Sequence, residues 1–339
     1  MTHAPLLVTM GDAAGIGPEI IASAFHAGAL GGAVVIGDVA VMRRACALWP
    51  ESFTSLAAIE APSDAARLPP GCLPVLPPPG LDSVLASLPW GRIDARNGAA
   101  AARCIEHAVK LVQAGQGGAI VTAPIHKEAL AAAGVAFPGH TEMLQALAAQ
   151  SGALPPVRMM LANDELRVVL VTIHLSLRHA IDALSFDAVL QTLRITQQSL
   201  VAFGIKAPRI AVAGLNPHAG EGGLFGDEER LFIAPAVDAA CAEGILASGP
   251  YAPDTVFMRA RHAPPAHVGE FDAVVAMTHD HGLIPVKYLG VEQGVNVTLG
   301  LPFVRTSPDH GTAFDIAGRG VADASSLIAA TRMARRLLG

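Results

Sequence analysis

The sequence predicts an α/β protein of two domains, in which mostly parallel sheets are flanked by helices. The first observation is an alternation of apolar strand-like runs with helix-like segments, beginning LLVTM, PEIIASAFHAG, AVVIG and VAVMRRACALW. This alternation is typical of βαβ units, so it favours a parallel sheet. The second observation is the length of 339 residues, which more naturally forms two lobes than a single domain.

The remaining elements follow along the chain in the same manner. From Pro62 to Pro89 the chain is rich in proline, which predicts loops or edge segments rather than a central strand. A helix is predicted from about Asn97 to Ala114, followed by the strand AIVTAP and the segment HKEALAAAGV. Later strand-like runs are RMMLAN, LRVVLVTI, RIAVAG, DAVVAM and VNVTLG. Further helices are predicted near Phe186 to Phe203, over DEERLFIAPAVDAACAEG, and from about Asp323 to Leu338.

The composition excludes several classes of protein. Hydrophobic residues make up 52% of the chain and charged residues 15%, which excludes a disordered protein. The formal net charge is −6 and there is no basic run, so nothing indicates nucleic-acid binding. No apolar run reaches the roughly 18 residues of a membrane span, and the start MTHAPLLVTMGD lacks the basic flank of a signal peptide. We therefore expect a cytoplasmic protein with no membrane partner.

Three histidines follow apolar strand-like runs: His174 in VTIHLSLRH, His218 in GLNPHAGEGG and His279 in AMTHDHGL. Because the carboxyl ends of strands in an open α/β sheet converge on one crevice, these side chains are expected near one another. Each histidine alone is more often a hydrogen-bonded or core residue. Three histidines with open positions, however, are what a catalytic divalent metal requires. Together the three therefore predict a metal site.

Further polar residues lie where a ligand would bind. In PGHTEMLQAL, His140 and Thr141 either cap a helix or form a substrate pocket on its free N–H groups. Lys287, Asn296 and Arg305 lie in apolar strand-like runs, where buried cations favour an anionic partner. The glycine-rich segment GLNPHAGEGGLFG lets the backbone approach a ligand, but it lacks the GxGxxG spacing of a dinucleotide fingerprint.

The stretch RTSPDHGTAFDIAGRG, near the C-terminus, is a second polar segment punctuated by glycine. Asp309 and His310 in it could hydrogen-bond a nucleotide or cap the following helix, and capping is the simpler interpretation. The chain has neither a GxSxG nucleophile elbow nor an HExxH zinc motif, so common hydrolase mechanisms have no support. A different metal-dependent hydrolase or lyase, or a ligand sensor without activity, stays as the alternative class of function.

Seven motifs that span nearly the whole chain occur in a characteristic order: GDAAGIGPEI, TAPIHK, PGHTEML, LNPHAGEGG, PYAPDTVF, THDHGL and GVNVTLGLPFVRTSPDHGTAFDIAGRG. Together they resemble the 4-hydroxythreonine-4-phosphate dehydrogenase family of pyridoxal phosphate biosynthesis. The resemblance implies a fold similar to isocitrate and isopropylmalate dehydrogenases. The expected lobes are residues 1–130 with 300–339, and residues 131–299. The active site is then expected in the cleft between the lobes and at the interface of a homodimer.

The activity implied by the resemblance is the oxidation, with decarboxylation, of 4-phosphooxy-L-threonine to 3-amino-2-oxopropyl phosphate. NAD or NADP would accept the hydride, and a divalent metal (zinc, magnesium, manganese or cobalt) would be shared between subunits. The metal ligands would be His174, His218 and His279. A proton must also leave the substrate hydroxyl, and Asp254 and Asp280 are the candidates to accept it.

Substrate and cofactor contacts are implied in the same way. The substrate would be bound by His140, Thr141, Lys287, Asn296 and Arg305. DHGTAFDIAGRG is similar to the nucleotide-binding loop of decarboxylating dehydrogenases, which changes its interpretation from a helix cap to a cofactor site. The cofactor would then be bound by Asp309, His310, Gly311 and Thr312.

Two positions depart from the family pattern. Ala13 stands where proline is usual, and His281 stands where glutamine is usual, two residues from His279. His281 could therefore change the contacts of the metal or the substrate. The ending DHGTAFDIAGRG is also closer to relatives that act on 4-phospho-erythronate or 4-phospho-threonate, or on the cis-dihydrodiol of terephthalate. A paralogue with one of those substrates is the alternative function.

Overall fold

The computed structural model describes residues 4–49, 55–149 and 152–339 of the chain. The chain divides into two compact units, Met1–Pro155 with Leu301–Leu338 and Pro156–Gly300. The sequence places the first boundary near residue 130, whereas the structure places it after Pro155. The reason is helix α5 (His140–Ala148), which packs against α3 (Ala95–Gln113) of the first unit.

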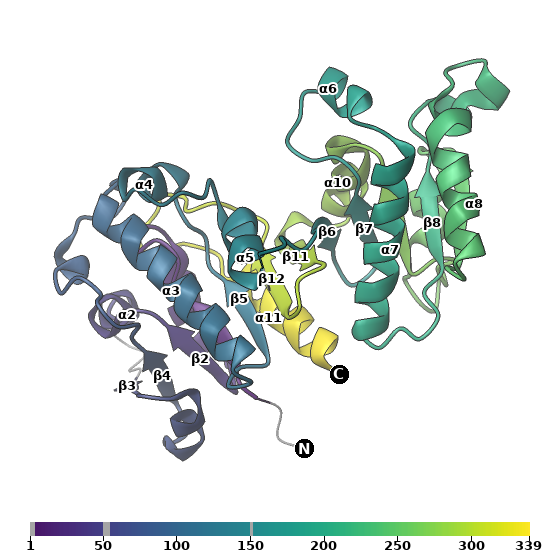
Figure 1. Cartoon of the computed structure of the whole chain (residues 1–339). Coiled ribbons are helices and arrows are strands. Elements are labelled where there is room, and N and C mark those ends of the chain that lie inside the picture. Colours follow the sequence, from purple (N-terminus) through teal and green to yellow (C-terminus); the bar gives the residue numbers. More distant parts are fainter. Residues whose placement is uncertain (1–3, 50–54, 150–151) are drawn as a thin grey trace. The chain divides into compact units, whose positions relative to one another are not determined.

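The first unit is built on parallel strands in the order β3-β4-β2-β1-β5-β12 (Figure 1). Their bounds are β1 Leu6–Thr9, β2 Ala33–Ile36, β3 Ser55–Ala58, β4 Cys72–Leu76, β5 Ala119–Thr122 and β12 Val304–Pro308. Every residue of β1, β2 and β5 is buried. Continuous burial is expected of a parallel sheet with both faces covered, and it explains why these strands are apolar without alternation.

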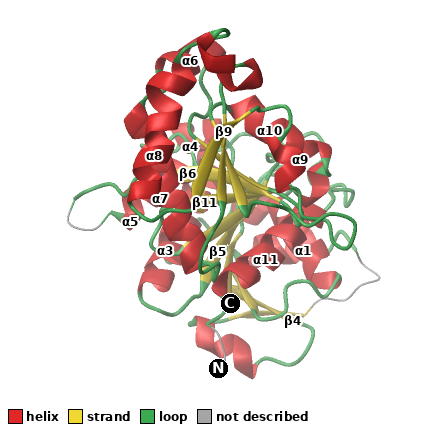
Figure 2. Cartoon of the chain, turned by 90° about the vertical axis from the view of Figure 1, so that its right-hand side faces the viewer, coloured by secondary structure: helices red, strands yellow, loops and turns green. Residues whose placement is uncertain are grey.

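Helices cover both faces of these strands. The helices of this unit are α1 Gly17–His26, α2 Val39–Cys46, α3, α4 Lys127–Ala132, α5 and α11 Ser325–Leu338, with short helical turns η1 Pro62–Arg67 and η2 Leu85–Ser87. The helix α3 packs on β1, β2 and β5, whereas α11 packs on β5 and β12 and contacts α1. Figure 2 shows α3 on one side of the strands and α1 with α11 on the other.

The proline-rich segment departs from the sequence prediction. It contributes β4, which pairs with β2 on one side and with β3 on the other, so the expectation of loops or edge segments is wrong there. Pro74 lies inside this strand. Because the N–H of a strand residue points toward only one neighbour, Pro74 costs a single ladder hydrogen bond and leaves the pairing on the other side intact.

The second unit contains strands in the order β11-β6-β7-β10-β8-β9. Their bounds are β6 Arg158–Ala162, β7 Arg167–Leu170, β8 Ile210–Ala213, β9 Ala247–Tyr251, β10 Ala273–Ala276 and β11 Val295–Leu299. β11 and β7 run antiparallel to β6, and the other three pairings are parallel. The prediction of α/β units with mostly parallel strands is therefore confirmed.

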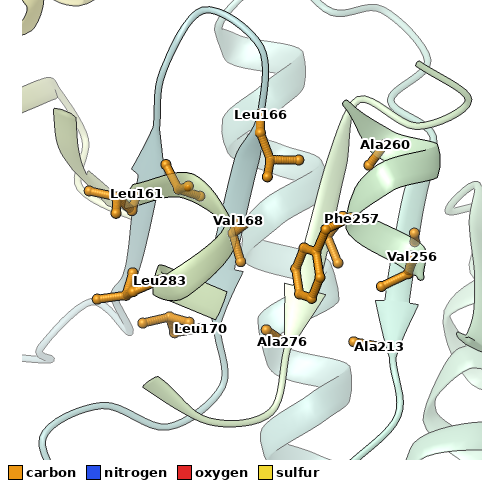
Figure 3. Close-up of a cluster of buried hydrophobic side chains, with 13 residues drawn as sticks. Leu161, Leu166, Val168, Leu170, Ala213, Val256, Phe257, Ala260, Ala276 and Leu283 are labelled. Carbon is orange, nitrogen blue, oxygen red and sulfur yellow. The ribbon is translucent and has the colours of Figure 1, made fainter. Parts of the chain in front are cut away.

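The helices of the second unit are α6 Leu177–Asp182, α7 Phe186–Ala202, α8 Ala234–Ala242, α9 Val256–Ala260 and α10 His279–Tyr288, with short turns η3 Pro217–Gly223, η4 Glu229–Ile233 and η5 Val291–Gln293. A buried cluster joins α9 and α10 to the sheet (Figure 3). In it, Leu283 of α10 packs with Val168 and Leu170 of β7. This packing fixes the start of α10, where His279 lies.

Lys287 is also placed differently from the sequence prediction, which put it in an apolar strand-like run. It lies in the last turn of α10 and is half-buried. Leu283 and Val286 face the core, while Ile284 is 64% exposed. A short apolar run of this kind does not distinguish a strand from one face of a packed helix, which explains the error. No helix in the described part of the chain is long and apolar enough to cross a membrane.

Candidate functional site

The three predicted histidines follow three neighbouring strands of the second unit. His174 follows β7, His279 follows β10 and His218 follows β8, and these strands lie side by side in the order β7-β10-β8. All three strands are parallel. Their carboxyl ends therefore lie at one edge of the sheet, as the sequence prediction required.

His174 and His279 lie close together at this edge. Their ring centroids are 5.5 Å apart, and both side chains line a cavity of about 470 Å³. Nδ1 of His279 is 2.8 Å from Oδ1 of Asp280, an exposed side chain in the first turn of α10. A carboxylate on one ring nitrogen orients an imidazole and leaves its other nitrogen available to a ligand.

The rest of the cavity wall is mainly apolar. Leu175, Leu177, Ile181 and Ile284 contribute aliphatic surface, and all four are partly exposed. His281 also lines the cavity. Its Nδ1 is buried with no hydrogen-bond partner in the described structure, and burial lowers its pKa. Aliphatic walls with a few placed polar groups are the usual composition of a small-molecule site.

His218 does not join the other two histidines. It is exposed on the loop after β8, with a φ of 53°, and its ring lies 6.1 Å from that of Phe225. Among residues 4–49, 55–149 and 152–339, no group of three His, Cys, Asp or Glu side chains is arranged to hold a metal ion. Within one chain, the structure therefore assembles two of the three predicted ligands.

A second polar cluster lies in the first unit, at Thr122, which ends β5, and at Arg305, near the start of β12. Arg305 is 3% exposed, and its Nε and Nη2 donate to Oγ1 of Thr122 at 3.2 and 2.7 Å. Burial lowers the pKa of Arg305 to about 10, so the side chain is still charged at neutral pH. A buried charge of this kind favours an anionic ligand.

His140, the first residue of α5, lies within the electrostatic influence of Arg305. Its pKa is well below the usual value because of burial and the charge of Arg305, and the hydrogen bond with the backbone of Ala123 only partly opposes this. The ring is therefore neutral at pH 7. Its Nε2 is buried without a partner in the described part of the chain. The neighbouring Thr141 is half-buried, and no side chain caps this helix.

The other predicted substrate residues belong to the second unit, and so do both candidate bases. Asn296 is half-buried in β11, and Lys287 lies in α10. Asp254 is exposed in the turn before α9 and is not among the residues that line the cavity. Asp280 contacts His279, as described above. Its position is that of a residue that orients the imidazole.

The predicted cofactor residues form a loop between β12 and α11. The N–H of Asp309 donates to Oγ of Ser326 at 3.3 Å, and the carbonyl of Thr312 accepts from Ile16 N–H at 3.0 Å. The exposed His310 places Nδ1 3.0 Å from the carbonyl oxygen of Gly311. These contacts hold the loop against the start of α1 and against α11.

Asp12 and Glu229 are among the buried carboxyl groups that sequence reasoning missed. Asp12 is fully buried after β1, accepts from the N–H of Ala14 at 2.8 Å, and has its pKa raised by burial to about 6. Glu229 is 5% exposed and accepts from two backbone N–H groups. The available signal for Asp12 was an acidic residue shortly after the apolar run LLVTM. For Glu229 it was an acidic residue shortly after the glycine-rich segment GLNPHAGEGGLFG.

Comparisons with known proteins agree over the whole chain. A family model described as pyridoxal phosphate biosynthetic protein PdxA matches residues 30–334. The 4-hydroxythreonine-4-phosphate dehydrogenase of Beijerinckia indica is 54% identical and covers 99% of this chain and 96% of its own. The D-threonate 4-phosphate dehydrogenase of Pectobacterium atrosepticum is 46% identical over 98% of each chain. The crystal structure of a 4-hydroxythreonine-4-phosphate dehydrogenase from Klebsiella pneumoniae matches with a TM-score of 0.90 and 44% identity, covering 99% and 98% of the two chains.

Proposed function

The chain belongs to the family of the pyridoxal phosphate biosynthetic protein PdxA, and from this premise we propose that it oxidises and decarboxylates 4-phosphooxy-L-threonine to 3-amino-2-oxopropyl phosphate. The observation that carries the choice of substrate class is the buried Arg305 beside the neutral His140. A phosphate offers this site nearly two negative charges and three acceptor oxygens. The 54% identity to a dehydrogenase of that name supports the same substrate.

The residues at the edge of the second unit fit a divalent metal in their chemistry. His174 and His279 offer imidazole nitrogens on one cavity wall, a donor type that suits zinc or cobalt better than magnesium. Asp280 would keep the ring of His279 oriented. Since His218 lies apart, we assign the third position to His218 of a second copy, as expected for a homodimer with a shared site. When bound, a divalent cation supplies Lewis acidity toward the reacting hydroxyl.

The remaining residues would hold the substrate and the dinucleotide. Arg305 and His140, with Thr141, are assigned to the phosphate, because a buried guanidinium that is charged at neutral pH is a strong donor to phosphate oxygens. Lys287 and Asn296 are assigned to the other substrate groups. The loop from Asp309 to Thr312 is assigned to NAD or NADP, since it exposes His310 and Gly311 while its backbone hydrogen bonds hold it in place. When bound, the dinucleotide supplies the hydride acceptor.

The chemistry requires two steps. A hydride leaves the carbon that bears the hydroxyl, and the hydroxyl proton passes to a base. In the resulting β-keto acid the bond to the carboxylate breaks, carbon dioxide leaves, the electron pair moves into an enolate, and a proton returns to carbon. Of the two candidate bases, Asp280 already contacts the ring of His279, so we assign it as a residue that positions this imidazole. Asp254 would act only if substrate reaches the turn before α9.

A second candidate substrate is 4-phospho-threonate, which carries a hydroxyl in place of the amine. A relative named D-threonate 4-phosphate dehydrogenase, 46% identical over 98% of this chain, favours it. The same two steps would then release dihydroxyacetone phosphate. The cluster of Arg305 and His140 would bind the phosphate of either substrate equally well. Contacts with the amine or the hydroxyl, the group in which the substrates differ, therefore decide between them.

The test is a substrate comparison with purified protein, zinc and NAD, following absorbance of the reduced nicotinamide. We expect fastest turnover with 4-phosphooxy-L-threonine, slower turnover with 4-phospho-threonate, and none with an unphosphorylated cis-dihydrodiol. Detection of 3-amino-2-oxopropyl phosphate or of dihydroxyacetone phosphate identifies the product. Faster oxidation of the dihydrodiol would contradict the phosphate assignment, and product formation without reduced nicotinamide would favour a hydrolase or lyase.

A further inference from the structure

The loop that carries His218 has an unusual backbone. Six consecutive residues, His218–Gly223, have positive φ values of 53°, 53°, 80°, 43°, 68° and 101°. Three of the six are glycines, but His218, Ala219 and Glu221 have side chains. The left-handed region is sterically unfavourable for residues with a Cβ, and a run of such residues persists only where surrounding contacts hold it.

Besides backbone hydrogen bonds within the loop, such contacts come from the carboxylate of Glu229, at the start of the helical turn that follows. Its Oε1 accepts from the backbone N–H groups of Leu215 and Asn216, both at 2.7 Å. Its Oε2 accepts from Nδ2 of Asn216 at 2.9 Å. Glu229 is only 5% exposed. Three donors on one buried carboxylate form charge-assisted hydrogen bonds, which are about twice as strong as neutral ones.

The same carboxylate also lies against the middle of the loop. A Cβ on Gly220 would lie 2.8 Å from Oε2 of Glu229, and a Cβ on Gly214 would lie 3.0 Å from Oε1. Glu229 therefore contacts the loop at its beginning and inside the left-handed turn. Leu215 and Asn216 also line the cavity that contains His174 and His279. The group that holds this loop thus also shapes the cavity wall.

We propose that Glu229 is a positioning residue, whose carboxylate holds the loop Gly214–Gly226 in the left-handed turn that presents the imidazole of His218. The functional part of this inference rests on the proposed role of His218 as a metal ligand. A glutamine at this position would offer one acceptor oxygen, and its amide would direct N–H groups toward donors of Asn216. The charge and both oxygens are therefore needed.

The experiment compares Glu229→Gln with Glu228→Gln. Glu228 is the adjacent residue, and its substitution removes the same charge. Within the described part of the chain its carboxylate accepts from the side chain of Asn216, at 2.7 Å, and from no backbone N–H. Hydrogen exchange of the metal-free protein measures how well the loop amides are protected. Titration with Zn²⁺ measures the affinity of the metal site. In Glu229→Gln we expect the amides of Leu215 and Asn216 to exchange at least about tenfold faster and Zn²⁺ affinity to fall about ten- to a hundredfold. Glu228→Gln should change both by less than about threefold.

Each alternative result has a distinct meaning. Unchanged exchange in Glu229→Gln overturns the proposal, and so does faster exchange with unchanged Zn²⁺ affinity. A wild-type protein that binds no Zn²⁺ contradicts the proposed metal site instead, and the exchange data still decide whether Glu229 holds the loop. If Glu229→Gln does not fold, wild-type exchange decides: the amides of Leu215 and Asn216 must exchange as slowly as those of β8. Exchange at the rate of an unprotected peptide would refute the role of Glu229.

Discussion

Arg305 shows how one buried residue limits the choice of ligand. Its guanidinium is almost fully buried, and its Nε and Nη2 donate to the hydroxyl of Thr122. Burial lowers its pKa only to about 10, so the side chain stays charged at neutral pH. A bound phosphate offers this buried charge negative oxygens that accept charge-assisted hydrogen bonds in the geometry that a guanidinium prefers.

Replacing Arg305 should therefore weaken substrate binding selectively. We expect Arg305→Gln to lower affinity for the phosphorylated substrate about ten- to a hundredfold, the scale of a lost charged hydrogen bond, with little change for NAD. Calorimetric titration of both ligands measures this. The control is Arg158→Gln, because Arg158 is also partly buried and donates to a threonine hydroxyl, at 2.7 Å. Equal losses in both variants would mean that the effect is not specific to the phosphate cluster.

The buried carboxyl group of Asp12 predicts how the stability of the protein depends on pH. Its pKa is raised to about 6 by burial, so its native form holds a proton more tightly than the unfolded chain does. Its contribution to stability is therefore fully present below about pH 4 and is lost as pH rises through 6. We expect Asp12→Asn to raise the free energy of unfolding at pH 8 by at most about 3 kcal/mol, with the difference shrinking toward pH 4. Urea unfolding across that pH range measures it.

Asp94 provides a control, because its contribution to stability depends on pH in the opposite direction. Its hydrogen bonds with the Arg96 side chain and backbone lower its pKa to about 2. The stability that it contributes is present above about pH 4 and is lost as pH falls toward 2. Asp94→Asn should therefore destabilise the protein at neutral pH. A stability gain of Asp12→Asn that grows on acidification would show that the Asp12 carboxyl is not the buried acid described here.

Among the elements, α10 is one that depends on close packing against the sheet. A Cβ on Gly282 would lie 2.4 Å from Cδ2 of Leu170 and 2.8 Å from Cγ1 of Val168, both on β7. The helix therefore approaches the sheet as closely as a glycine allows. Because α10 begins with His279, any displacement of this helix also displaces a candidate metal ligand.

We expect Gly282→Ala to lower the free energy of unfolding by about 1–3 kcal/mol, the usual cost of overpacking a core. Urea denaturation measures the loss, and Zn²⁺ affinity should fall with it as His279 moves. Gly31→Ala is the matched control, because a Cβ there meets nothing within 4 Å. Its effect should stay within about 0.5 kcal/mol. If Gly282→Ala leaves the free energy of unfolding and the Zn²⁺ affinity unchanged, α10 can shift without affecting its neighbours.

For the whole molecule, the separation of His218 from His174 and His279 predicts how mixed dimers behave. If His218 comes from the second copy, mixing His218→Ala with His279→Ala chains leaves one intact site in each hybrid dimer. With random pairing, activity should recover to about a quarter of the wild-type level. Turnover after subunit exchange, followed by native mass spectrometry, measures this.

The control mixture is His174→Ala with His279→Ala. Their ring centroids lie 5.5 Å apart within one chain, so every site in such a hybrid lacks one ligand of the pair. No recovery is expected. Recovery in this mixture, or none with His218→Ala despite demonstrated exchange, would contradict the assignment of His218 to the partner.

The sequence by itself determined the alternation of most strands and helices along the chain, because apolar periodicity and glycine spacing are local properties. It also placed His174, His218 and His279 after strands, and these strands are neighbours in the sheet. Only the tertiary structure decided which side chains meet. The clustering of Arg305 with His140, the helical position of Lys287 and the burial of Glu229 depend on packing between segments distant in sequence. No local pattern specifies such contacts, since they arise when the sheet and its helices close around the core.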